Sequence, residues 1–376
     1  MKDGRIALLD LSLDELQTLF QSWGELPYRA KQVWSRLYQK LAASFDEMTE
    51  LSRALREKLA QETVIGRLTP RAEQRSSDGQ TRKLLFALPD GAQIEAVLMS
   101  YERRRTTCIS TQAGCAMNCS FCATGQGGFQ RNLTSGEIIE QVLYFARELA
   151  SEVRGQRSEV KSRQSEINNQ QSTISNIVFM GMGEPFANFD HVMAAVRRFN
   201  DPQGLNFGAR RMTVSTVGLP PGINRLAGED IQINLAVSLH AATDELRNRL
   251  VPINKRYPLS ELMPAVREYI EKTHRRVSFE WALIEGVNDT LEQAHALARL
   301  IKGMLCHVNL IPLNPTSGYP GAASTRERIA AFRSVLESAG IPNTLRLRRG
   351  IDIQAGCGQL KSQMSNIKSQ KPTFEI

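Results

Sequence analysis

The feature that most constrains the fold of this chain is a regular alternation of strand-like and helix-like segments from about residue 104 onward. Short runs of apolar and β-branched residues, typical of strands, occupy residues 106–111, 177–180, 212–216, 233–239, 277–283, 307–311 and 344–347. Longer amphipathic runs, typical of helices, occupy residues 135–150, 190–199, 259–273, 291–304 and 325–339. Repeated β–α units predict a parallel sheet covered by helices. About six such units predict an α/β fold that closes partly or wholly into a barrel, with working residues at the C-terminal ends of the strands.

The residues before this alternation have a helical pattern. Ser12 and Glu15 have the spacing of a capping box, and apolar residues follow at helical intervals. A second helix is expected after Pro27, with its aromatic residues in the core. Its basic residues, among them Lys31 and Arg36, form either a solvated face or an RNA-binding surface.

Two segments have low complexity. Residues 151–175 contain a seven-residue repeat with a single apolar position, and residues 361–371 have a similar composition. Low apolar content predicts a disordered or fraying surface insertion and a flexible tail. The predicted parts of the chain are a helical N-terminal accessory domain (1–82), a connecting β-hairpin (83–103), a barrel (104–360) with its insertion (151–175), and the tail (361–376).

Composition sets broad limits on the class of protein. The chain has 376 residues, a formal net charge of +8 and six cysteines. The positive charge favours a polyanionic partner such as nucleic acid, and six cysteines in a chain of this length do not form a disulfide framework. The sequence starts without an apolar leader and has no run long enough to span a membrane. We therefore expect a cytoplasmic monomer with no membrane contact.

Three of the cysteines, Cys115, Cys119 and Cys122, have the spacing C-x3-C-x2-C directly after the first predicted strand. Thiolates that short loops bring together suit a soft metal ion or an iron–sulfur cluster. A [4Fe–4S] cluster held by three cysteines keeps one iron free for a substrate. The alternative is a structural zinc site that Cys108 or Cys357 completes.

The three-cysteine motif resembles that of the radical S-adenosylmethionine superfamily, whose cluster loop follows the first barrel strand. The surrounding sequence, from Cys108 through Cys122 to Gly136-Glu137-Ile138, resembles that of the bacterial RNA methyltransferases that modify C2 of adenosine in 23S rRNA and tRNA. The resemblance extends from the N-terminal helices to about Cys357. It implies a radical SAM barrel of partial (β/α)6 type, a [4Fe–4S] cluster, and S-adenosylmethionine as cosubstrate.

The resemblance also implies which residues bind S-adenosylmethionine. A Gly-Glu pair that holds the amino-acid part of the cosubstrate corresponds to Gly183 and Glu184, and a carboxylate can bind an ammonium group. The other implied contacts follow predicted strands and are Ser215, Ser238, Leu239, His240 and Asn314.

Two further cysteines define the reaction in this family. The mechanism that the resemblance implies is that one S-adenosylmethionine methylates Cys357, and a radical made from a second one removes hydrogen from that methyl group. The carbon radical then adds to C2, which is too electron-poor for ordinary methylation, and Glu95 corresponds to the proposed proton acceptor. Attack of Cys108 on the Cys357 sulfur would release the product and leave a transient disulfide. An electron donor such as flavodoxin is implied.

Alternatives remain open at this point. A related antibiotic-resistance methyltransferase acts on C8 of adenosine with equivalent cysteines, although Gly128-Phe129 and Arg131-Asn132-Leu133 fit the C2 enzymes better. A non-catalytic RNA-binding protein with a structural metal is a second alternative. The sixth cysteine, Cys306, has no family counterpart and is expected to be buried and structural.

Overall fold

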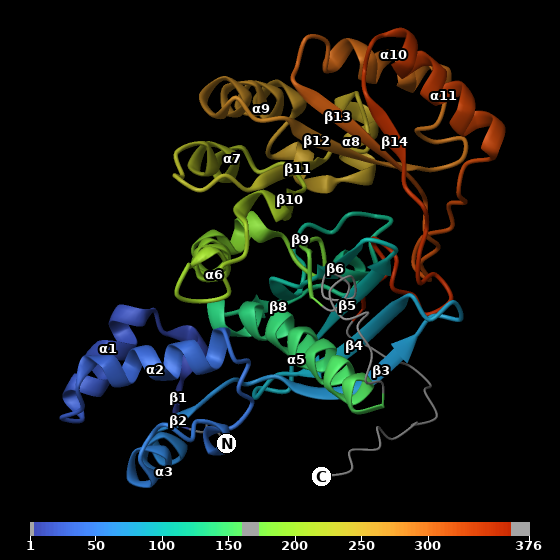
Figure 1. Cartoon of the computed structure of the whole chain (residues 1–376). Helices are drawn as coiled ribbons and strands as arrows, with labels where there is room; N and C mark the ends of the chain where they lie inside the picture. Colours follow the sequence, from blue (N-terminus) through green and yellow to red (C-terminus); the bar gives the residue numbers. More distant parts are fainter. Residues whose placement is uncertain (1–3, 160–172, 362–376) are drawn as a thin grey trace.

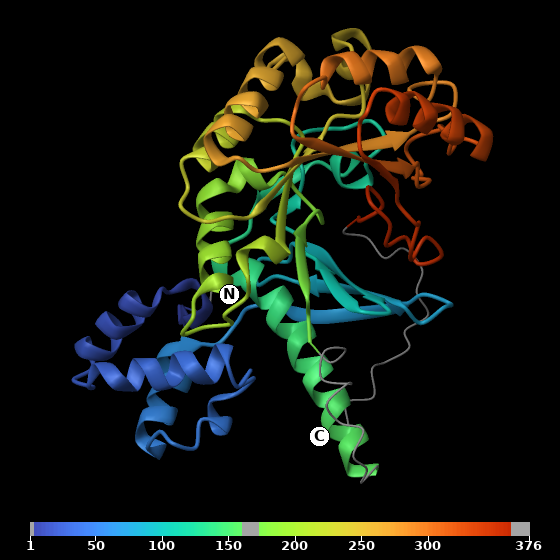
Figure 2. The ribbon, with the colours of Figure 1, turned by 45° about the horizontal axis from the view of Figure 1, so that its top comes forward.

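The computed structural model describes residues 4–159 and 173–361 (Figures 1 and 2). Its centre is a ten-stranded sheet with the order β14-β13-β12-β11-β10-β9-β6-β5-β4-β3. The strands from β6 to β14 are mutually parallel, and β3, β4 and β5 continue the sheet in antiparallel fashion. The parallel strands are β6 (Arg104–Cys108), β9 (Asn176–Phe179), β10 (Met212–Thr216), β11 (Asn234–Ser238), β12 (Val277–Leu283), β13 (Cys306–Pro312) and β14 (Asn343–Leu345).

A helix follows each of the first six parallel strands, so that six β–α units precede β14. These helices are α5 (Ser135–Glu159), α6 (Phe189–Asn200), α7 (Pro220–Ala227), α9 (Leu259–Thr273), α10 (Leu291–Leu300) and α11 (Arg326–Ser338). They lie along the outer side of the curved sheet in Figure 1. This is the predicted partial (β/α)6 barrel. The short helix α8 (Asp244–Leu250) precedes α9 within the fourth unit.

The antiparallel part of the sheet contains the predicted hairpin. Strands β4 (Thr81–Ala87) and β5 (Gln93–Tyr101) pair with each other, and β5 also pairs with β6. The hairpin is therefore part of the central sheet and not only a connection. Strand β3 (Thr69–Arg75) lies at the edge beyond β4. The sequence pattern does not predict β3, because it is a polar edge strand whose residues alternate between exposed and partly buried positions.

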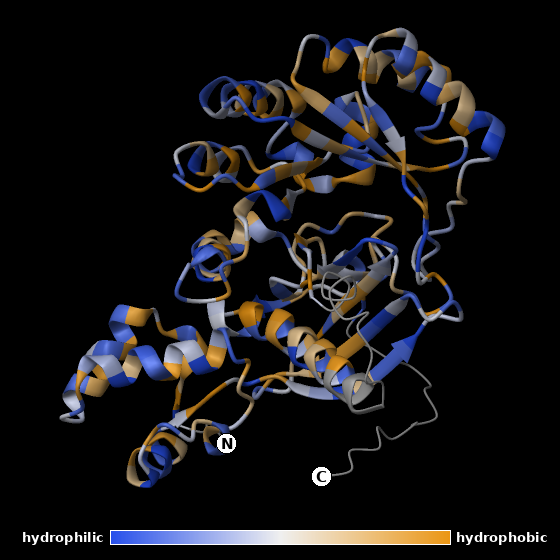
Figure 3. Cartoon of the chain, in the orientation of Figure 1, coloured by the Kyte–Doolittle hydropathy of each residue, from blue (hydrophilic) through white to orange (hydrophobic). Residues whose placement is uncertain are grey.

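The N-terminal unit consists of α1 (Leu13–Ser22), α2 (Pro27–Tyr38), α3 (Arg53–Glu62) and a short parallel pair formed by β1 (Ile6–Ala7) and β2 (Thr63–Val64). Ser12 and Glu15 form the predicted capping box at the start of α1. In Figure 3 the helices of this unit alternate between hydrophilic and hydrophobic stretches. The buried side chains of α2 include Trp34 and Tyr38, as predicted.

Contacts with α6 hold the N-terminal unit against the barrel. The Trp34 indole Nε1 donates a hydrogen bond to Asp201 Oδ2 at 3.1 Å, just beyond the end of α6. The buried guanidinium of Arg198 donates to the Tyr38 hydroxyl at 2.9 Å and lies 4.6 Å from the centre of the Trp34 ring. A cation over an indole face adds an attractive electrostatic contact to this packing.

Each of the other predicted elements has a counterpart in the structure, most of them within a few residues of the predicted bounds. Helices α7 and α8 have no counterpart in the prediction. Helix α5 extends to Glu159, so the first nine residues of the predicted insertion continue a helix. The rest of the seven-residue repeat up to residue 172, and the tail beyond residue 361, lie outside the described residues. No helix among the described residues is long and apolar enough to cross a membrane.

Candidate active site

The three-cysteine loop lies between two short antiparallel strands, β7 (Gln112–Gly114) and β8 (Phe129–Asn132). Cys115 follows β7 directly, and its backbone N–H donates to the Gly128 carbonyl at 2.8 Å. Gly114 has a φ of 77°, and a Cβ there would lie 2.0 Å from the Gly128 carbonyl oxygen. A glycine is therefore required for the two strands to approach at the base of the loop.

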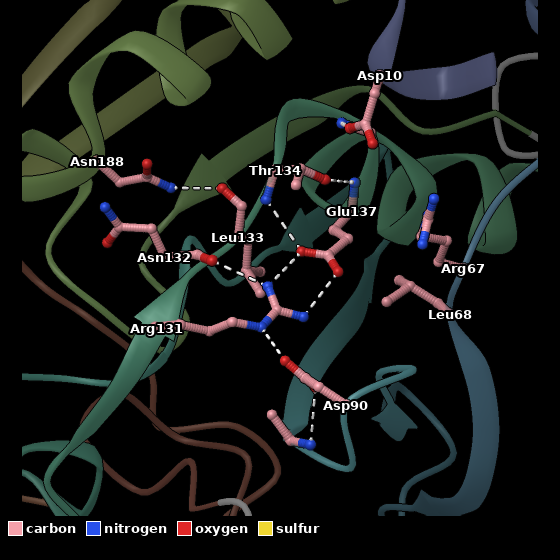
Figure 4. Close-up of polar contacts among 12 residues, drawn as sticks. Asp10, Arg67, Leu68, Asp90, Arg131, Asn132, Leu133, Thr134, Glu137 and Asn188 are labelled. Carbon is pink, nitrogen blue, oxygen red and sulfur yellow. Dashed lines mark hydrogen bonds and ion pairs between the residues drawn. The ribbon is translucent and has the colours of Figure 1, made fainter. Parts of the chain in front are cut away.

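A network of polar contacts fixes the far side of this loop (Figure 4). The Arg131 guanidinium on β8 binds both carboxylate oxygens of Glu137 at 2.7 and 2.8 Å and also pairs with Asp90 on the β4–β5 turn. Glu137 in turn caps α5, because its carboxylate accepts from the Thr134 N–H at 3.0 Å. The Asn188 amide donates to the Leu133 carbonyl at 2.8 Å. A bidentate arginine–carboxylate pair has fixed geometry, so β8, α5 and the hairpin are held together.

All three motif cysteines line one cavity of about 160 Å³ at the C-terminal ends of the parallel strands. Most of the predicted cosubstrate-binding residues line it as well: Gly183, Glu184, Ser215, Ser238, His240 and Asn314. Cys357 also borders this cavity. With Glu280 and Ala282 on β12, seven segments that are far apart in the sequence contribute to one site. This site lies at the end of the sheet where a barrel is expected to carry its functional residues.

Glu184 is a buried carboxylate on the wall of this cavity. Its Oε2 accepts from the Val217 N–H at 2.8 Å, and its Oε1 accepts from the Phe186 N–H at 3.0 Å. Burial raises the pKa of Glu184 to about 7, although the hydrogen bonds lower it. Its neighbour Gly183 has a φ of 101°, and a Cβ there would lie 2.5 Å from the Gln112 side chain. A side chain at position 183 would therefore obstruct the turn that places the carboxylate.

His240 is buried and takes the left-handed conformation, with a φ of 59°. Its Nδ1 accepts a hydrogen bond from the Ala282 N–H at 3.0 Å, so the proton of the neutral ring is on Nε2. Burial, with a contribution from the positive charge of Arg247, lowers the pKa of His240 to about 3. The Phe121 ring lies edge-on to the imidazole at 4.9 Å. His240 is thus a neutral hydrogen-bond donor toward the cavity.

Leu239 differs from the other predicted residues because its side chain is fully buried in the core. It is not among the described residues that line the cavity. Its backbone N–H donates to the Glu280 carbonyl, and its carbonyl accepts from Arg247 Nε at 3.1 Å. Its connection with the site is through the main chain that leads to His240.

The predicted pair Cys108 and Cys357 borders a second cavity of about 60 Å³. Cys357 and Asn314 line both cavities, so the two are adjacent. The Asn314 amide donates to the Cys357 carbonyl at 3.1 Å and holds the turn that carries this cysteine. Both cysteines are free thiols, with Cys108 buried and Cys357 exposed. Burial raises the pKa of Cys108 to about 12, which keeps its thiol protonated in this state.

Glu95 lies on β5 and is buried. It is not among the described residues that line either cavity. Its Oε1 is 3.1 Å from the Lys83 ammonium, and its Oε2 accepts from the Lys361 N–H at 2.9 Å. Lys83 also donates to the Gln354 carbonyl at 3.3 Å. The pair therefore binds both ends of the segment that carries Cys357. Burial raises the pKa of Glu95, which makes it a better proton acceptor once ionised.

Sequence reasoning missed two buried polar residues that shape the site. The Arg247 guanidinium donates to the carbonyls of Val217 and Leu239 and to Asn254 Oδ1. It therefore fixes the loops that follow β10 and β11. Asn288 donates to the carbonyls of His240 and Ala282 at 2.8 and 2.6 Å. No local pattern marks either residue, because each also bonds to a carbonyl far away in sequence, Val217 for Arg247 and His240 for Asn288. Arg247 lies on helix α8, which was not predicted.

The three motif thiols lie where they could hold an iron–sulfur cluster. They border one cavity. The thiolate ligands of such a cluster bind different irons, so they border a shared space. Cys306, the remaining cysteine, is buried in the core as expected. The cavity wall supplies a carboxylate, hydroxyls and a neutral imidazole for a polar cosubstrate.

The fold and the three-cysteine cavity place the chain in the class of radical S-adenosylmethionine methyltransferases. A crystal structure of a radical SAM methyltransferase from Sphaerobacter thermophilus matches with a TM-score of 0.88 at 49% identity, over 95% of this chain and 100% of that one. For this fold, S-adenosylmethionine and a [4Fe–4S] cluster are properties of the family.

The family itself follows from the curated relatives. The chain is 51% identical to the probable dual-specificity RNA methyltransferase RlmN of Chloroflexus aurantiacus, over 95% of this chain and 93% of the relative. It is 50% identical to RlmN 1 of Myxococcus xanthus, over 94% of each chain. Residues 6–65 match the family model described as the ribosomal RNA large subunit methyltransferase N-terminal domain. The chain belongs to the RlmN family of dual-specificity RNA methyltransferases.

Proposed function

We propose that this chain methylates C2 of adenosine in 23S rRNA and in tRNA, with Cys357 as the carrier of the methyl group. The observation that carries the proposal is the position of Cys357. It borders both the cavity of the three motif cysteines and the cavity of Cys108. One sulfur can therefore receive a methyl group on the cosubstrate side and be attacked by a second sulfur on the other side.

Cys115, Cys119 and Cys122 would hold the [4Fe–4S] cluster. The cosubstrate would occupy the adjoining cavity, with Gly183 and Glu184 at its amino-acid end and the remaining contacts from Ser215, Ser238, Leu239, His240 and Asn314. A carboxylate that a ligand ammonium neutralises is favoured in such a buried site. His240 would donate a hydrogen bond from Nε2, and Leu239 would act through its main chain. When bound, cluster and cosubstrate together supply the radical chemistry that an electron-poor carbon requires.

The protein residues then determine the order of events at the two sulfurs. The Cys357 thiolate is the nucleophile that accepts the methyl group in a displacement reaction. After the carrier carbon is joined to the base, the buried Glu95 would accept the proton lost from C2. The Cys108 thiolate would then attack the Cys357 sulfur, so that an S–S bond forms as the S–C bond to the carrier carbon breaks; that carbon keeps the electron pair and takes up a proton to become the methyl group of the product. This last step needs the Cys108 thiolate, whose formation burial opposes in the free protein. A bound RNA or a local movement must therefore assist it.

The N-terminal unit is the expected RNA-binding accessory part. Its basic residues differ in whether a carboxylate of the unit already neutralises them. Arg36 forms an ion pair with Glu50, so it is already neutralised within the unit. Lys31 is exposed on the same helix. Of the two residues, Lys31 is the one we assign to an RNA contact.

The proposal further includes a flavodoxin-like electron donor, a monomeric enzyme, and a location in the cytoplasm, where both RNAs reside.

The proposal is tested by anaerobic reconstitution of the wild-type protein and of Cys357→Ala with rRNA and tRNA fragments. We expect Cys357→Ala to bind iron and sulfide in the wild-type ratio and to cleave S-adenosylmethionine, yet to form no methylated RNA. Wild-type methylation by the variant would exclude Cys357 as the carrier. A matched control is Cys306→Ala, since Cys306 is buried away from both cavities and its loss should affect stability only.

A further inference from the structure

A third cavity, of about 610 Å³, lies at the opposite end of the parallel strands from the cysteine loop. It is lined by side chains at the N-terminal ends of β10, β11 and β12, namely Thr213, Asn234 and Ser278, together with Asn309 on β13. Side chains along a strand alternate between its two faces. Thr213 therefore shares a face with Ser215, Asn234 with Ser238, and Ser278 with Glu280. The third cavity and the cosubstrate cavity are two ends of the same inner face of the sheet.

The third cavity is also adjacent to the other two. Met180 and Glu280 line both the third cavity and the cosubstrate cavity. Val178, Met180 and Arg346 line both the third cavity and the one that Cys108 and Cys357 border. Only the side chains that these cavities share thus separate a group at the N-terminal ends of the strands from the two sulfurs, on the side away from the cluster loop.

Four arginines line this third cavity: Arg210, Arg275, Arg276 and Arg346, here called the arginine rim. Glu280 is the sole carboxylate among the described residues of the lining, and it pairs with Arg346 at 3.4 Å. Four positive charges thus face one negative charge.

The three arginines nearer the N-terminal strand ends have no carboxylate partner among the described residues. Arg210 donates to Gln232 Oε1 at 2.9 Å, and Arg275 donates to Asn234 Oδ1 at 3.1 Å. Both partners are neutral amides, so the positive charges remain. The Arg275 Nε is buried and has no hydrogen-bond partner. This cluster of unneutralised guanidinium groups is therefore complementary to an anion.

We infer that the arginine rim binds the phosphates of unpaired RNA next to the target adenosine, so that the base enters from the end opposite the cluster. The inference rests on the proposed function, since it assigns the path by which RNA reaches Cys357. Guanidinium groups bind phosphate oxygens in a bidentate manner. Arg210 precedes β10 and the pair Arg275 and Arg276 precedes β12, two strands further along the sheet, which is about 10 Å at a strand spacing of about 4.8 Å. This length suits a stretch of backbone better than a single phosphate. A base removed from its stack is what chemistry on a ring carbon requires.

The inference is tested with the reconstituted holoenzyme and a single-stranded RNA oligonucleotide centred on one adenosine, through binding constants measured over a range of salt concentrations. The rim variant is Arg275→Gln with Arg276→Gln. The matched control is Arg299→Gln with Lys302→Gln, which removes the same charge from exposed positions at the end of α10. Each phosphate contact on a single strand contributes about −0.7 to the slope of log K against log salt. Loss of two contacts should flatten the slope by about 1.4, while the control keeps nearly the wild-type slope.

Equal slopes in the rim variant and the control would overturn the inference. Cluster content and RNA-independent cleavage of S-adenosylmethionine should stay at wild-type level in both, which separates an RNA contact from misfolding. The conservative variant Arg275→Lys with Arg276→Lys should recover most of the slope, because the charges remain. RNA binding is scored separately from product. If the rim variant has a flatter salt slope than the wild type, but the wild type makes no methylated RNA, the proposed function is rejected and the RNA-binding site is still supported.

Discussion

The Lys83 ammonium lies 3.1 Å from a carboxylate oxygen of Glu95 inside the central sheet, on two adjacent antiparallel strands. Both side chains are almost fully buried. Their remaining contacts reach Gln354 and Lys361, on either side of Cys357. This ion pair therefore connects Glu95, the proposed proton acceptor, with the segment that carries Cys357, the proposed methyl carrier.

Replacement of Lys83 by Met should therefore be costly. It leaves a buried carboxylate without its counter-charge, which typically destabilises a protein by about 3–5 kcal/mol. Lys83→Met combined with Glu95→Gln should recover a large part of that loss, because no unpaired charge remains. Denaturant unfolding of the two single variants and the double variant measures the coupling. Additive losses would show that the pair contributes no mutual stabilisation.

Asn288 provides a second test, at the cosubstrate cavity. Its side chain donates to two carbonyls and accepts from the Ile284 N–H at 2.8 Å. Asn288→Ala leaves these buried groups unpaired and should lower the free energy of unfolding by about 3 kcal/mol, at roughly 1 kcal/mol per bond. The His240 turn should also loosen and weaken cosubstrate binding in the folded protein. Asn224→Ala, at an exposed position on α7, is the control. A loss no larger than that of the control would contradict the positioning role.

Glu140 on α5 should make stability depend on pH. Its carboxylate accepts from the backbone N–H groups of Arg67 and Leu68 at 2.7 and 3.0 Å, and burial raises its pKa to about 7. Between its ordinary pKa of 4.5 and about 7, the folded chain holds a proton that the unfolded chain has released. The contribution of Glu140 to stability therefore falls as pH rises through this window.

Glu140→Gln keeps an acceptor for the two N–H groups and removes the titration. The free energy of unfolding of the variant, relative to that of the wild type, should rise by roughly 1–3 kcal/mol from pH 5 to pH 7.5. Unfolding free energies at the two pH values measure this gain. Glu271→Gln, an exposed residue on α9, should show no such difference. A gain that is equal at both pH values would exclude a raised pKa at Glu140.

Much of the fold follows from local pattern. Strands β10 and β12 and helix α9 have the predicted bounds, because their apolar periodicity ends sharply at turn residues. Strand β3 has too few apolar residues for such a pattern. Helices α7 and α8 are short, with 8 and 7 residues, and their boundaries depend on packing against later parts of the chain.

Only part of the site can be predicted from the sequence. The spacing of Cys115, Cys119 and Cys122 indicates a cluster by itself, because the three lie in one loop. The roles of Cys108 and Cys357 came from family resemblance, and only the fold brings them to one cavity. Burial of Glu95 against Lys83 requires the register of β4 on β5, which a hairpin pattern alone does not define. The cavity at the arginine rim likewise depends on five strands, β9 to β13, lying side by side.

Cys108→Ala tests the release step. Without its sulfur nothing in the proposal removes the base from the Cys357 carrier, so a covalent protein–RNA species should accumulate. Denaturing gel electrophoresis with labelled RNA would detect it, and nuclease treatment should leave a nucleotide on a peptide that contains Cys357. Cys108→Ala combined with Cys357→Ala should form no adduct. Full turnover by Cys108→Ala would show that another group performs the release.

The most direct test of the central claim is the position of the new methyl group. The reconstituted holoenzyme would be supplied with a reductant, S-adenosylmethionine and either an rRNA or a tRNA fragment. The RNA would then be digested to nucleosides and analysed by mass spectrometry against C2- and C8-methyladenosine standards. We predict 2-methyladenosine from both RNAs. Methylation at C8, or at a nitrogen of the base, would contradict the proposed function.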